Sequence, residues 1–188
     1  IRAFILGDND MTRALITGFT GMVGSHLADY LLAHTDWEIH GMCRWRSPLD
    51  NVRHLIGRMN ARDRVFLVDG DLTDYASLLR VIDQVRPDYV FHLAAQSYPK
   101  TSFSSPLMTL DVNITGTARL LDVILKHPDV DPVIHVCASS EVFGRVPPEK
   151  LPINEECTFH PASPYAISKV GTDLIGRYYG EAYGLKTV

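Results

Sequence analysis

The stretch "TGFTGMVG" at residues 17–24 decides the fold, because its three glycines stand between a strand-like run and a helix-like run. The apolar run 13–16 precedes it, and "GSHLADYLLAH" at 24–34 follows with helical periodicity. A helix N-terminus carries unpaired N–H groups and a positive dipole end, which attract a pyrophosphate. Glycines let the backbone turn sharply and approach the phosphates. In this context the GxxGxxG spacing predicts a dinucleotide-binding turn.

Strand-like and helix-like segments alternate along the rest of the chain. Buried-strand runs lie at 38–43, 64–71, 88–95 and 132–139. Helical periodicity is found at 75–85, at 110–125 and at 163–184. One face of the first helix is expected to carry Val23, Leu27, Tyr30 and Leu31. Apolar strands separated by helices indicate a parallel sheet covered on both faces. We therefore expect an α/β fold with a doubly wound parallel sheet of the Rossmann type.

The two ends of the sequence bear on the domain assignment. Met11 stands directly before the first strand, so we interpret residues 1–10 as a tag or an upstream extension. The final "LKTV" at 185–188 reads as the start of a sixth strand. We expect 11–188 to be one dinucleotide-binding domain truncated at that strand, with a C-terminal substrate-binding portion absent from this chain.

The composition argues against several classes of protein. A net charge of −4 gives no general attraction to nucleic acid or an anionic membrane, and no stretch approaches the roughly 18 apolar residues of a membrane span. Cys43, Cys137 and Cys157 are odd in number and far apart, which favours a reducing, cytoplasmic setting without structural zinc. Cys43, Cys137, His92 and His135 lie in apolar runs and read as core residues, so we expect no metal site.

The end of the second strand bears on the choice of nicotinamide cofactor. Domains that prefer NAD carry an acid about 20 residues past the glycine turn, whereas an arginine there suits a 2′-phosphate. The segment "HGMCRWRSP" at 40–48 has Arg44 and Arg46 and no acid. A guanidinium can hold a phosphate by paired hydrogen bonds, so NADP is favoured over NAD. Asp71 follows the third strand, where it could accept from an adenine amino group or cap a helix starting at Thr73.

A second motif carries the chemistry. "PYAISK" at 164–169 places Tyr165 and Lys169 four residues apart, hence on one face of a helix. A neighbouring ammonium favours the phenolate of a tyrosine, whose free pKa is about 10. Beside a nicotinamide, such a pair can take a proton from a sugar hydroxyl while hydride leaves the same carbon. Ser139, at the tip of the strand 132–139, is placed to orient that hydroxyl.

Five motifs, in order, resemble the extended short-chain dehydrogenase/reductases that modify nucleotide sugars: "TGFTGMVG", "DGDLTD", "HLAAQS", "SSEVFG" and "YAISK". The resemblance covers essentially the whole chain from Met11 onward. Within that group the chain is most similar to the GDP-mannose 4,6-dehydratases, in "AAQS", in "HGMCRWRS" and in the Ser-Ser-Glu triplet before "VFG". The resemblance implies a homodimer or homotetramer that pairs through the helices carrying Asn113 and Tyr165. Asn113 would brace the site as in the family, or lie on a solvated helix face.

The resemblance also implies a reaction and roles for the residues that match. Ser139 would orient O4 of the hexose, Tyr165 would be the base for the C4 hydroxyl, and Lys169 would lower the pKa of Tyr165 and hold the nicotinamide ribose. Glu141 would take the C5 proton and assist loss of the C6 hydroxyl. Hydride would pass from C4 to NADP and return to C6. The implied enzyme is a lyase that converts GDP-mannose to GDP-4-keto-6-deoxymannose.

The resemblance implies two sets of binding residues. The cofactor would be lined by Gly18, Thr20, Gly21, Met22, Val23, Gly24, Arg44, Arg46, Asp71, Leu72, Leu93, Ala94, Ala95, Tyr165 and Lys169. The sugar would be bound by Ser97, Ser139, Glu141 and Tyr165.

The sequence departs from the dehydratase pattern at three positions. Ser139 stands where those enzymes usually have Thr, Trp45 separates the two arginines, and Pro99 enters the loop after "AAQS". "SSEVFG" is also similar to reductases of GDP-4-keto-6-deoxymannose and to UDP-glucuronate decarboxylases. A reductase, another epimerase or decarboxylase of the same family, and a non-catalytic NADP-binding module therefore stay open as alternatives.

Overall fold

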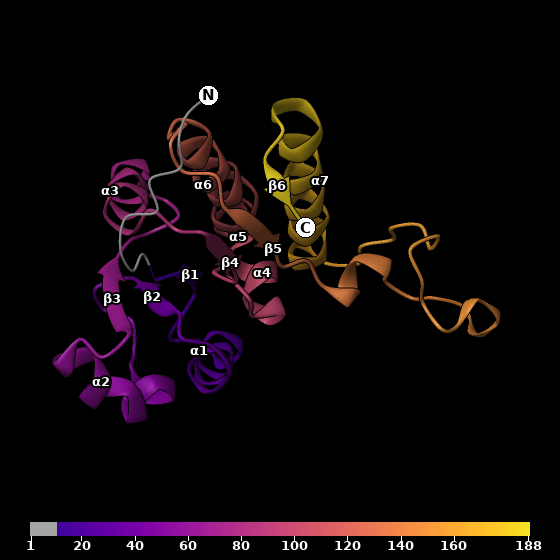
Figure 1. Cartoon of the computed structure of the whole chain (residues 1–188). Coiled ribbons are helices and arrows are strands. Elements are labelled where there is room, and N and C mark those ends of the chain that lie inside the picture. Colours follow the sequence, from indigo (N-terminus) through magenta and orange to yellow (C-terminus); the bar gives the residue numbers. More distant parts are fainter. Residues whose placement is uncertain (1–10) are drawn as a thin grey trace.

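The structure, a computed structural model, describes residues 11–188, and the interpretation of residues 1–10 lies outside that range (Figure 1). The elements are, in chain order, β1 (Arg13–Thr17), α1 (Met22–His34), β2 (Glu38–Cys43), η1 (Asp50–Leu55), α2 (Ile56–Ala61), β3 (Val65–Asp69), α3 (Tyr75–Val85), β4 (Tyr89–His92), α4 (Pro99–Ser104), α5 (Pro106–Leu110), η2 (Asp111–Thr115), α6 (Gly116–Leu125), β5 (Val133–Val136), η3 (Ser140–Phe143), η4 (Pro148–Lys150), α7 (Pro164–Tyr183) and β6 (Lys186–Thr187). Every predicted strand forms, most of them shorter than its apolar run.

The strands form one parallel sheet in the order β3-β2-β1-β4-β5-β6. Thr17, at the end of β1, pairs with Met42 on β2 and with His92 on β4, so the carboxyl ends of these strands lie level. The chain leaves β1 toward one side of the sheet and returns through β4 on the other, which opens a crevice between the loops after these two strands. The predicted doubly wound parallel sheet is confirmed.

Helices cover the two faces of the sheet to different extents (Figure 1). α3, α6 and α7 pack on one face, over a core that includes Leu15, Val90 and Ile134. α1 and η1 pack on the other face, over Ile16 and Ile39, and this second core does not extend to β5. His135 on β5 is therefore exposed, and its prediction as a core residue is wrong.

α1 turns only part of the predicted apolar face to the sheet: Leu27 and Leu31 pack against the core. Val23 and Tyr30 are more than half exposed, whereas Gly24, Ala28 and Leu31 are buried. A Cβ on Gly24 would lie 2.5 Å from the carbonyl oxygen of Gly18, so the small-residue side packs tightly onto the turn. Close backbone packing sets the orientation here: Leu27 and Leu31 of the predicted face pack against the core, whereas Val23 and Tyr30 point outward.

Two cysteines are less buried than expected. Cys43 and Cys137 are half-buried rather than core residues, because each follows or ends a strand at the sheet's carboxyl edge. All three cysteines are free.

Capping residues define α7 and α3. The Ser163 hydroxyl accepts from the Ala166 N–H, Pro164 occupies the first turn of α7, and Gly184 ends the helix at φ +75°, as the sequence predicts. α3 begins at Tyr75, as the periodicity at 75–85 predicts, and its cap is Asp74, so the alternative that Asp71 caps a helix starting at Thr73 is wrong.

The long helix expected through 110–125 is continuous but irregular. α5 runs into the π-helical turn η2, which runs into α6. Asn113 lies in this π turn and is only 1% exposed, so the alternative of a solvated helix face is wrong. Such turns are frequent at functional sites.

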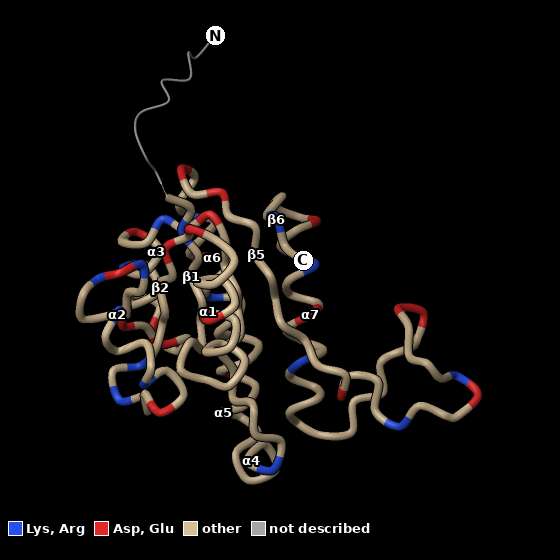
Figure 2. Tube along the Cα trace, turned by 60° about the horizontal axis from the view of Figure 1, so that its bottom comes forward, with Lys and Arg blue, Asp and Glu red and all other residues tan. Residues whose placement is uncertain are grey.

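The segment 144–162 between η3 and α7 stands away from the sheet and helices in both views, and we call it the arm (Figures 1 and 2). Its base is closed where the His160 N–H donates to the Val142 carbonyl over 2.9 Å. Among residues 11–188 no helix is long and apolar enough to cross a membrane.

Candidate active site

A cleft of about 590 Å³ opens at the carboxyl ends of β1 to β4. It brings together these predicted binding residues: Gly18, Thr20, Gly21, Arg44, Asp71, Leu72, Leu93, Ala94, Ala95 and Ser97. Its other lining residues, which the sequence reasoning did not assign, are Met42, Cys43, Ser47, Gly70, Thr73, Gln96, Tyr98, Met108 and Val112. The quoted motifs "DGDLTD" and "AAQS" contain Gly70, Thr73 and Gln96, and "HGMCRWRS" contains Met42, Cys43 and Ser47, whereas no quoted motif contains Met108 or Val112.

The glycine turn forms one wall of the cleft by close backbone approach. Gly18 has φ +71°, and a Cβ there would lie 2.8 Å from the Ala94 nitrogen. Gly21 caps α1 without a side-chain hydrogen bond, so no side chain occupies the helix N-terminus. An unblocked helix N-terminus with a positive dipole end fits a pyrophosphate. The side chains of Met22 and Val23 are exposed, and these residues and Gly24 adjoin the cleft through the first turn of α1.

The two candidate arginines take different positions. Arg44 lines the cleft and is exposed, whereas the Arg46 guanidinium lies 5.3 Å above the Trp45 ring and outside the lining. Asp71 lines the same cleft, and its Oδ1 accepts from both the N–H and the hydroxyl of Thr73. The remaining carboxylate oxygen has no such bond, so the adenine role for Asp71 stays a prediction.

Tyr165 and Lys169 share the buried face of α7, as their spacing predicts. Tyr165 is 9% exposed and Lys169 5% exposed. The Lys169 ammonium donates to the Cys137 carbonyl over 2.7 Å, which ties α7 to the segment that follows β5. Burial lowers the pKa of Lys169, while the nearby Cys137 acts in the opposite direction. The site therefore contains a desolvated amine next to a buried phenol.

Ser139 and Glu141 stand at the end of β5, where the sequence predicts them. The Ser139 hydroxyl caps η3 by accepting from the Glu141 N–H over 3.2 Å. Glu141 is exposed. Ser139, Glu141, Tyr165 and Lys169 gather around the β5 end, next to the cleft but not among its lining residues.

A buried amide joins the cleft wall to α7. The Asn113 Oδ1 accepts from the Gln96 N–H over 2.7 Å, and its Nδ2 donates to the Gln96 carbonyl and to the Ser168 hydroxyl. The Ser168 hydroxyl in turn donates to the Tyr165 carbonyl over 2.6 Å. Of the two alternatives for Asn113, the structure therefore supports the one in which its amide braces the site. The sequence did not indicate that Ser168 would be its partner.

The family-model comparison decides the family. The model described as GDP-mannose 4,6 dehydratase matches residues 15–188, which is most of the chain. The chain belongs to the GDP-mannose 4,6-dehydratase family. GDP-mannose 4,6 dehydratase 2 of Arabidopsis thaliana is 42% identical over 179 residues, which are 92% of this chain and 47% of that protein. The chain spans about half the length of the curated relatives that it matches.

Solved structures show the same extended short-chain dehydrogenase/reductase fold with bound cofactors. The Thermus thermophilus UDP-glucose 4-epimerase complex with NAD has a TM-score of 0.80 and 31% identity, over 94% of this chain and 53% of that one. RMD from Pseudomonas aeruginosa, complexed with NADPH, has a TM-score of 0.73 and 31% identity, over 94% and 52%. A nicotinamide cofactor is thus supported for this member of the GDP-mannose 4,6-dehydratase family.

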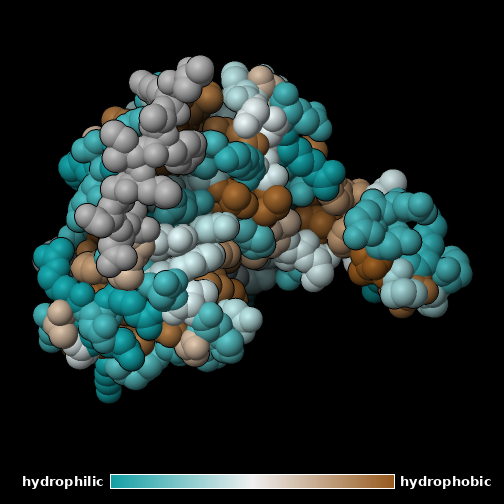
Figure 3. Space-filling model, viewed as in Figure 1, coloured by the Kyte–Doolittle hydropathy of each residue, from teal (hydrophilic) through white to brown (hydrophobic). Residues whose placement is uncertain are grey.

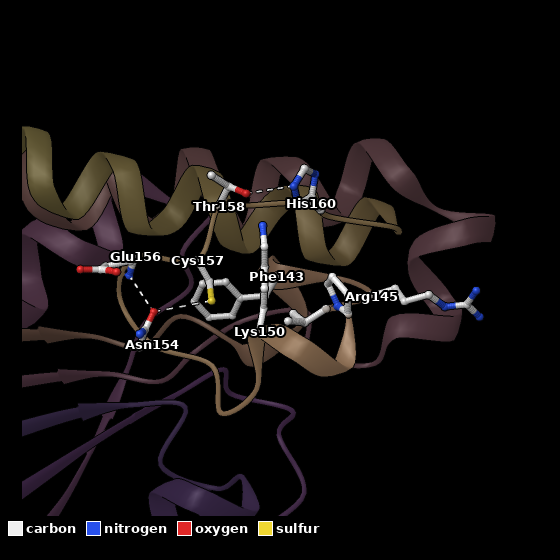
Figure 4. Close-up of a pocket in the computed structure, with 10 residues that line it drawn as sticks. Phe143, Arg145, Lys150, Asn154, Glu156, Cys157, Thr158 and His160 are labelled. Carbon is white, nitrogen blue, oxygen red and sulfur yellow. Dashed lines mark hydrogen bonds between the residues drawn. The ribbon is translucent and has the colours of Figure 1, made fainter.

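A second hollow lies in the arm (Figures 3 and 4). It is separate from the cleft at the carboxyl ends of β1 to β4. Phe143, Cys157 and His160 are among its lining residues, and none of its lining residues lines the cleft. Asn154 closes a turn there, where its Oδ1 accepts from the Glu156 N–H. The hollow contains none of the predicted site residues.

The lowered pKa of Lys169 predicts how stability depends on pH. The unfolded chain keeps this proton up to its ordinary pKa of 10.5, whereas the folded chain loses it at lower pH. Between these values the unfolded state binds more protons, so the Lys169 contribution to the unfolding free energy rises with pH. We expect wild type to gain stability relative to Lys169→Met in urea denaturation as the pH rises toward the ordinary lysine pKa of 10.5.

Lys126→Met is the matched control for this measurement. Its bonds to Tyr75 and Asp122 raise the pKa of Lys126, so its contribution is constant below the unfolded value. If the difference in unfolding free energy between wild type and Lys169→Met is as independent of pH as that between wild type and Lys126→Met, then Lys169 is not desolvated.

Proposed function

We propose that the full-length protein is a cytoplasmic, NADP-dependent GDP-mannose 4,6-dehydratase, a lyase that forms GDP-4-keto-6-deoxymannose. The observation that carries the proposal is the buried Tyr165–Lys169 face of α7, held against the segment after β5 that bears Ser139 and Glu141. The family match adds the substrate class. The glycine cradle beside it, which a Cβ at Gly18 would fill, fits a dinucleotide.

The residues of this chain divide the proton transfers. Tyr165 takes the proton of the C4 hydroxyl, with Ser139 holding that hydroxyl by a hydrogen bond. Lys169 stabilises the phenolate through its charge and holds the cofactor ribose. Glu141 then takes the C5 proton and gives it to the departing C6 hydroxyl, so water leaves. When hydride reaches C6, a proton returns to C5, which balances the one that Tyr165 took from the C4 hydroxyl. When bound, NADP⁺ supplies the hydride chemistry, accepting at C4 and returning to C6, with no net redox change.

The direct test supplies the full-length protein with GDP-mannose and a catalytic amount of NADP⁺. We expect a 4-keto-6-deoxy sugar nucleotide by mass spectrometry and no net accumulation of NADPH. Tyr165→Phe removes the base, and general acid–base catalysis contributes about 10²- to 10⁴-fold, so turnover is expected to fall by that factor with cofactor binding near normal. Turnover at the wild-type rate in this variant contradicts the assigned base. Oxidation of NADPH by the keto compound, without dehydration of GDP-mannose, would identify a reductase instead.

The NADP preference rests on Arg44 in the cleft wall. Loss of a charge-assisted bond to the 2′-phosphate costs about 1.5–3 kcal/mol, so Arg44→Ala is expected to raise the Kd for NADP by roughly 10- to 100-fold and leave that for NAD nearly unchanged. Arg53→Ala is the control, because Arg53 pairs with Asp50 outside the cleft. The affinities are measured by titration calorimetry. If Arg44→Ala loses affinity for NADP and for NAD equally, Arg44 does not bind the 2′-phosphate.

We further propose that the protein forms a homodimer, or a homotetramer built from such dimers, through α7 and its neighbour α5. Ile167, Leu174 and Tyr178 lie along one side of α7 and are about half exposed, and Leu107 on α5 is 79% exposed. Leu174→Glu is expected to shift the full-length protein toward monomer in sedimentation velocity. Tyr30→Glu, an exposed apolar position on α1, is the control and is expected to keep the wild-type mass. Unchanged mass for both variants would argue against this interface.

A further inference from the structure

His92 ends β4 directly below the cleft wall and takes no part in the proposed chemistry. It is 3% exposed. Its Nδ1 lies 2.9 Å from the Thr17 hydroxyl, and its Nε2 lies 2.9 Å from the Thr117 hydroxyl. A neutral imidazole carries one proton, so the two partners must differ in role.

The hydrogen bonds around His92 determine which of its two ring nitrogens carries the proton. The Thr117 hydroxyl donates its only proton to the Asn113 carbonyl over 2.6 Å, so it can only accept from His92. The proton of His92 therefore sits on Nε2, and Nδ1 accepts from the Thr17 hydroxyl. The two lone pairs of the Thr17 oxygen then accept the N–H groups of Leu93 and Ala94, each over 3.1 Å. Each hydroxyl and ring proton in this chain therefore has one acceptor, while the Leu93 N–H is shared between the Thr17 oxygen and the Phe91 carbonyl.

We propose that His92 is a positioning residue, locked as the Nε2–H tautomer, which holds Leu93 and Ala94 against the glycine turn through the hydroxyl of Thr17. Ala94 is the residue whose nitrogen a Cβ on Gly18 would meet at 2.8 Å, so the width of the gap between the two cleft walls depends on this chain of bonds. The consequence for cofactor binding rests on the proposed function, whereas the tautomer does not.

The surroundings of His92 favour the neutral ring. Burial lowers its pKa to about 3, and electrostatic repulsion from Lys169 and His135 acts in the same direction. A proton on Nδ1 would face the Thr17 oxygen, whose lone pairs already accept two backbone N–H groups. Protonation would thus break the bonds that hold Leu93 and Ala94.

The tautomer can be observed directly in the full-length protein. With ¹⁵N-labelled histidine, long-range ¹H–¹⁵N spectra are expected to show one ring with a bare Nδ1 and a protonated Nε2. These shifts are expected to stay unchanged from about pH 8 to about pH 5, because the lowered pKa lies below that range. His92→Gln assigns the signal by its disappearance. A protonated Nδ1, or a ring that titrates near its ordinary pKa, overturns the proposal whether or not the protein is a dehydratase.

The positioning role is tested one bond away, at Thr17. Thr17→Val keeps the shape but leaves His92 Nδ1 and the Ala94 N–H without their partner and the Leu93 N–H with the Phe91 carbonyl alone, whereas Thr17→Ser keeps the hydroxyl. Unpaired buried groups cost about 1–3 kcal/mol, so Thr17→Val is expected to weaken binding of the nicotinamide cofactor by about ten-fold or more. Thr17→Ser is expected to restore binding to within about three-fold of wild type and to retain the bare Nδ1 signal. Equal cofactor affinity in Thr17→Val and Thr17→Ser overturns the positioning role. Both the histidine spectra and the cofactor affinities can be measured even if the protein does not dehydrate GDP-mannose.

Discussion

The close approach of Gly18 to Ala94 is the constraint on which the candidate site depends. The loops after β1 and β4 part at the point where the strand order reverses, and they stay within van der Waals distance only because Gly18 has no side chain. The same turn presents the N-terminus of α1 without a side-chain cap. A sharp turn, a small gap and an unblocked helix dipole therefore come from one glycine-rich segment.

Buried polar hydrogen bonds connect this cleft to α7, which carries Tyr165 and Lys169. Asn113 joins Gln96 in the cleft wall to Ser168 in α7, and Lys169 joins α7 to the segment after β5. The π turn at η2 places the Asn113 amide in the interior. Because buried polar groups are costly unless they are paired, these bonds hold the parts of the site in a single arrangement.

Local patterns in the sequence predicted the elements better than they predicted the packing. The strand–turn–helix at 13–34, the caps of α7 and the shared face of Tyr165 and Lys169 follow from neighbouring residues, and the structure contains them. The buried face of α1 was predicted correctly at Leu27 and Leu31 and wrongly at Val23 and Tyr30, because apolarity alone does not reveal that the glycine side of a helix can pack more closely.

Contacts between distant segments could not be predicted. The bond between Asn113 and Ser168 joins residues 55 positions apart, and the bond from Lys169 to the Cys137 carbonyl involves a backbone atom with no sequence signature. The division of roles between Arg44 and Arg46 depends on the turn at Ser47 and on the Trp45 ring, which only the folded loop reveals.

A crystal structure of the full-length protein with bound NADP⁺ would show directly where the cofactor lies relative to the glycine turn and to Tyr165. The account predicts the pyrophosphate at the first turn of α1 and the nicotinamide ribose within hydrogen-bond distance of Lys169, with the Tyr165 hydroxyl facing the nicotinamide ring. A dinucleotide bound away from the glycine turn, or a Tyr165 hydroxyl directed to solvent in that complex, would contradict it.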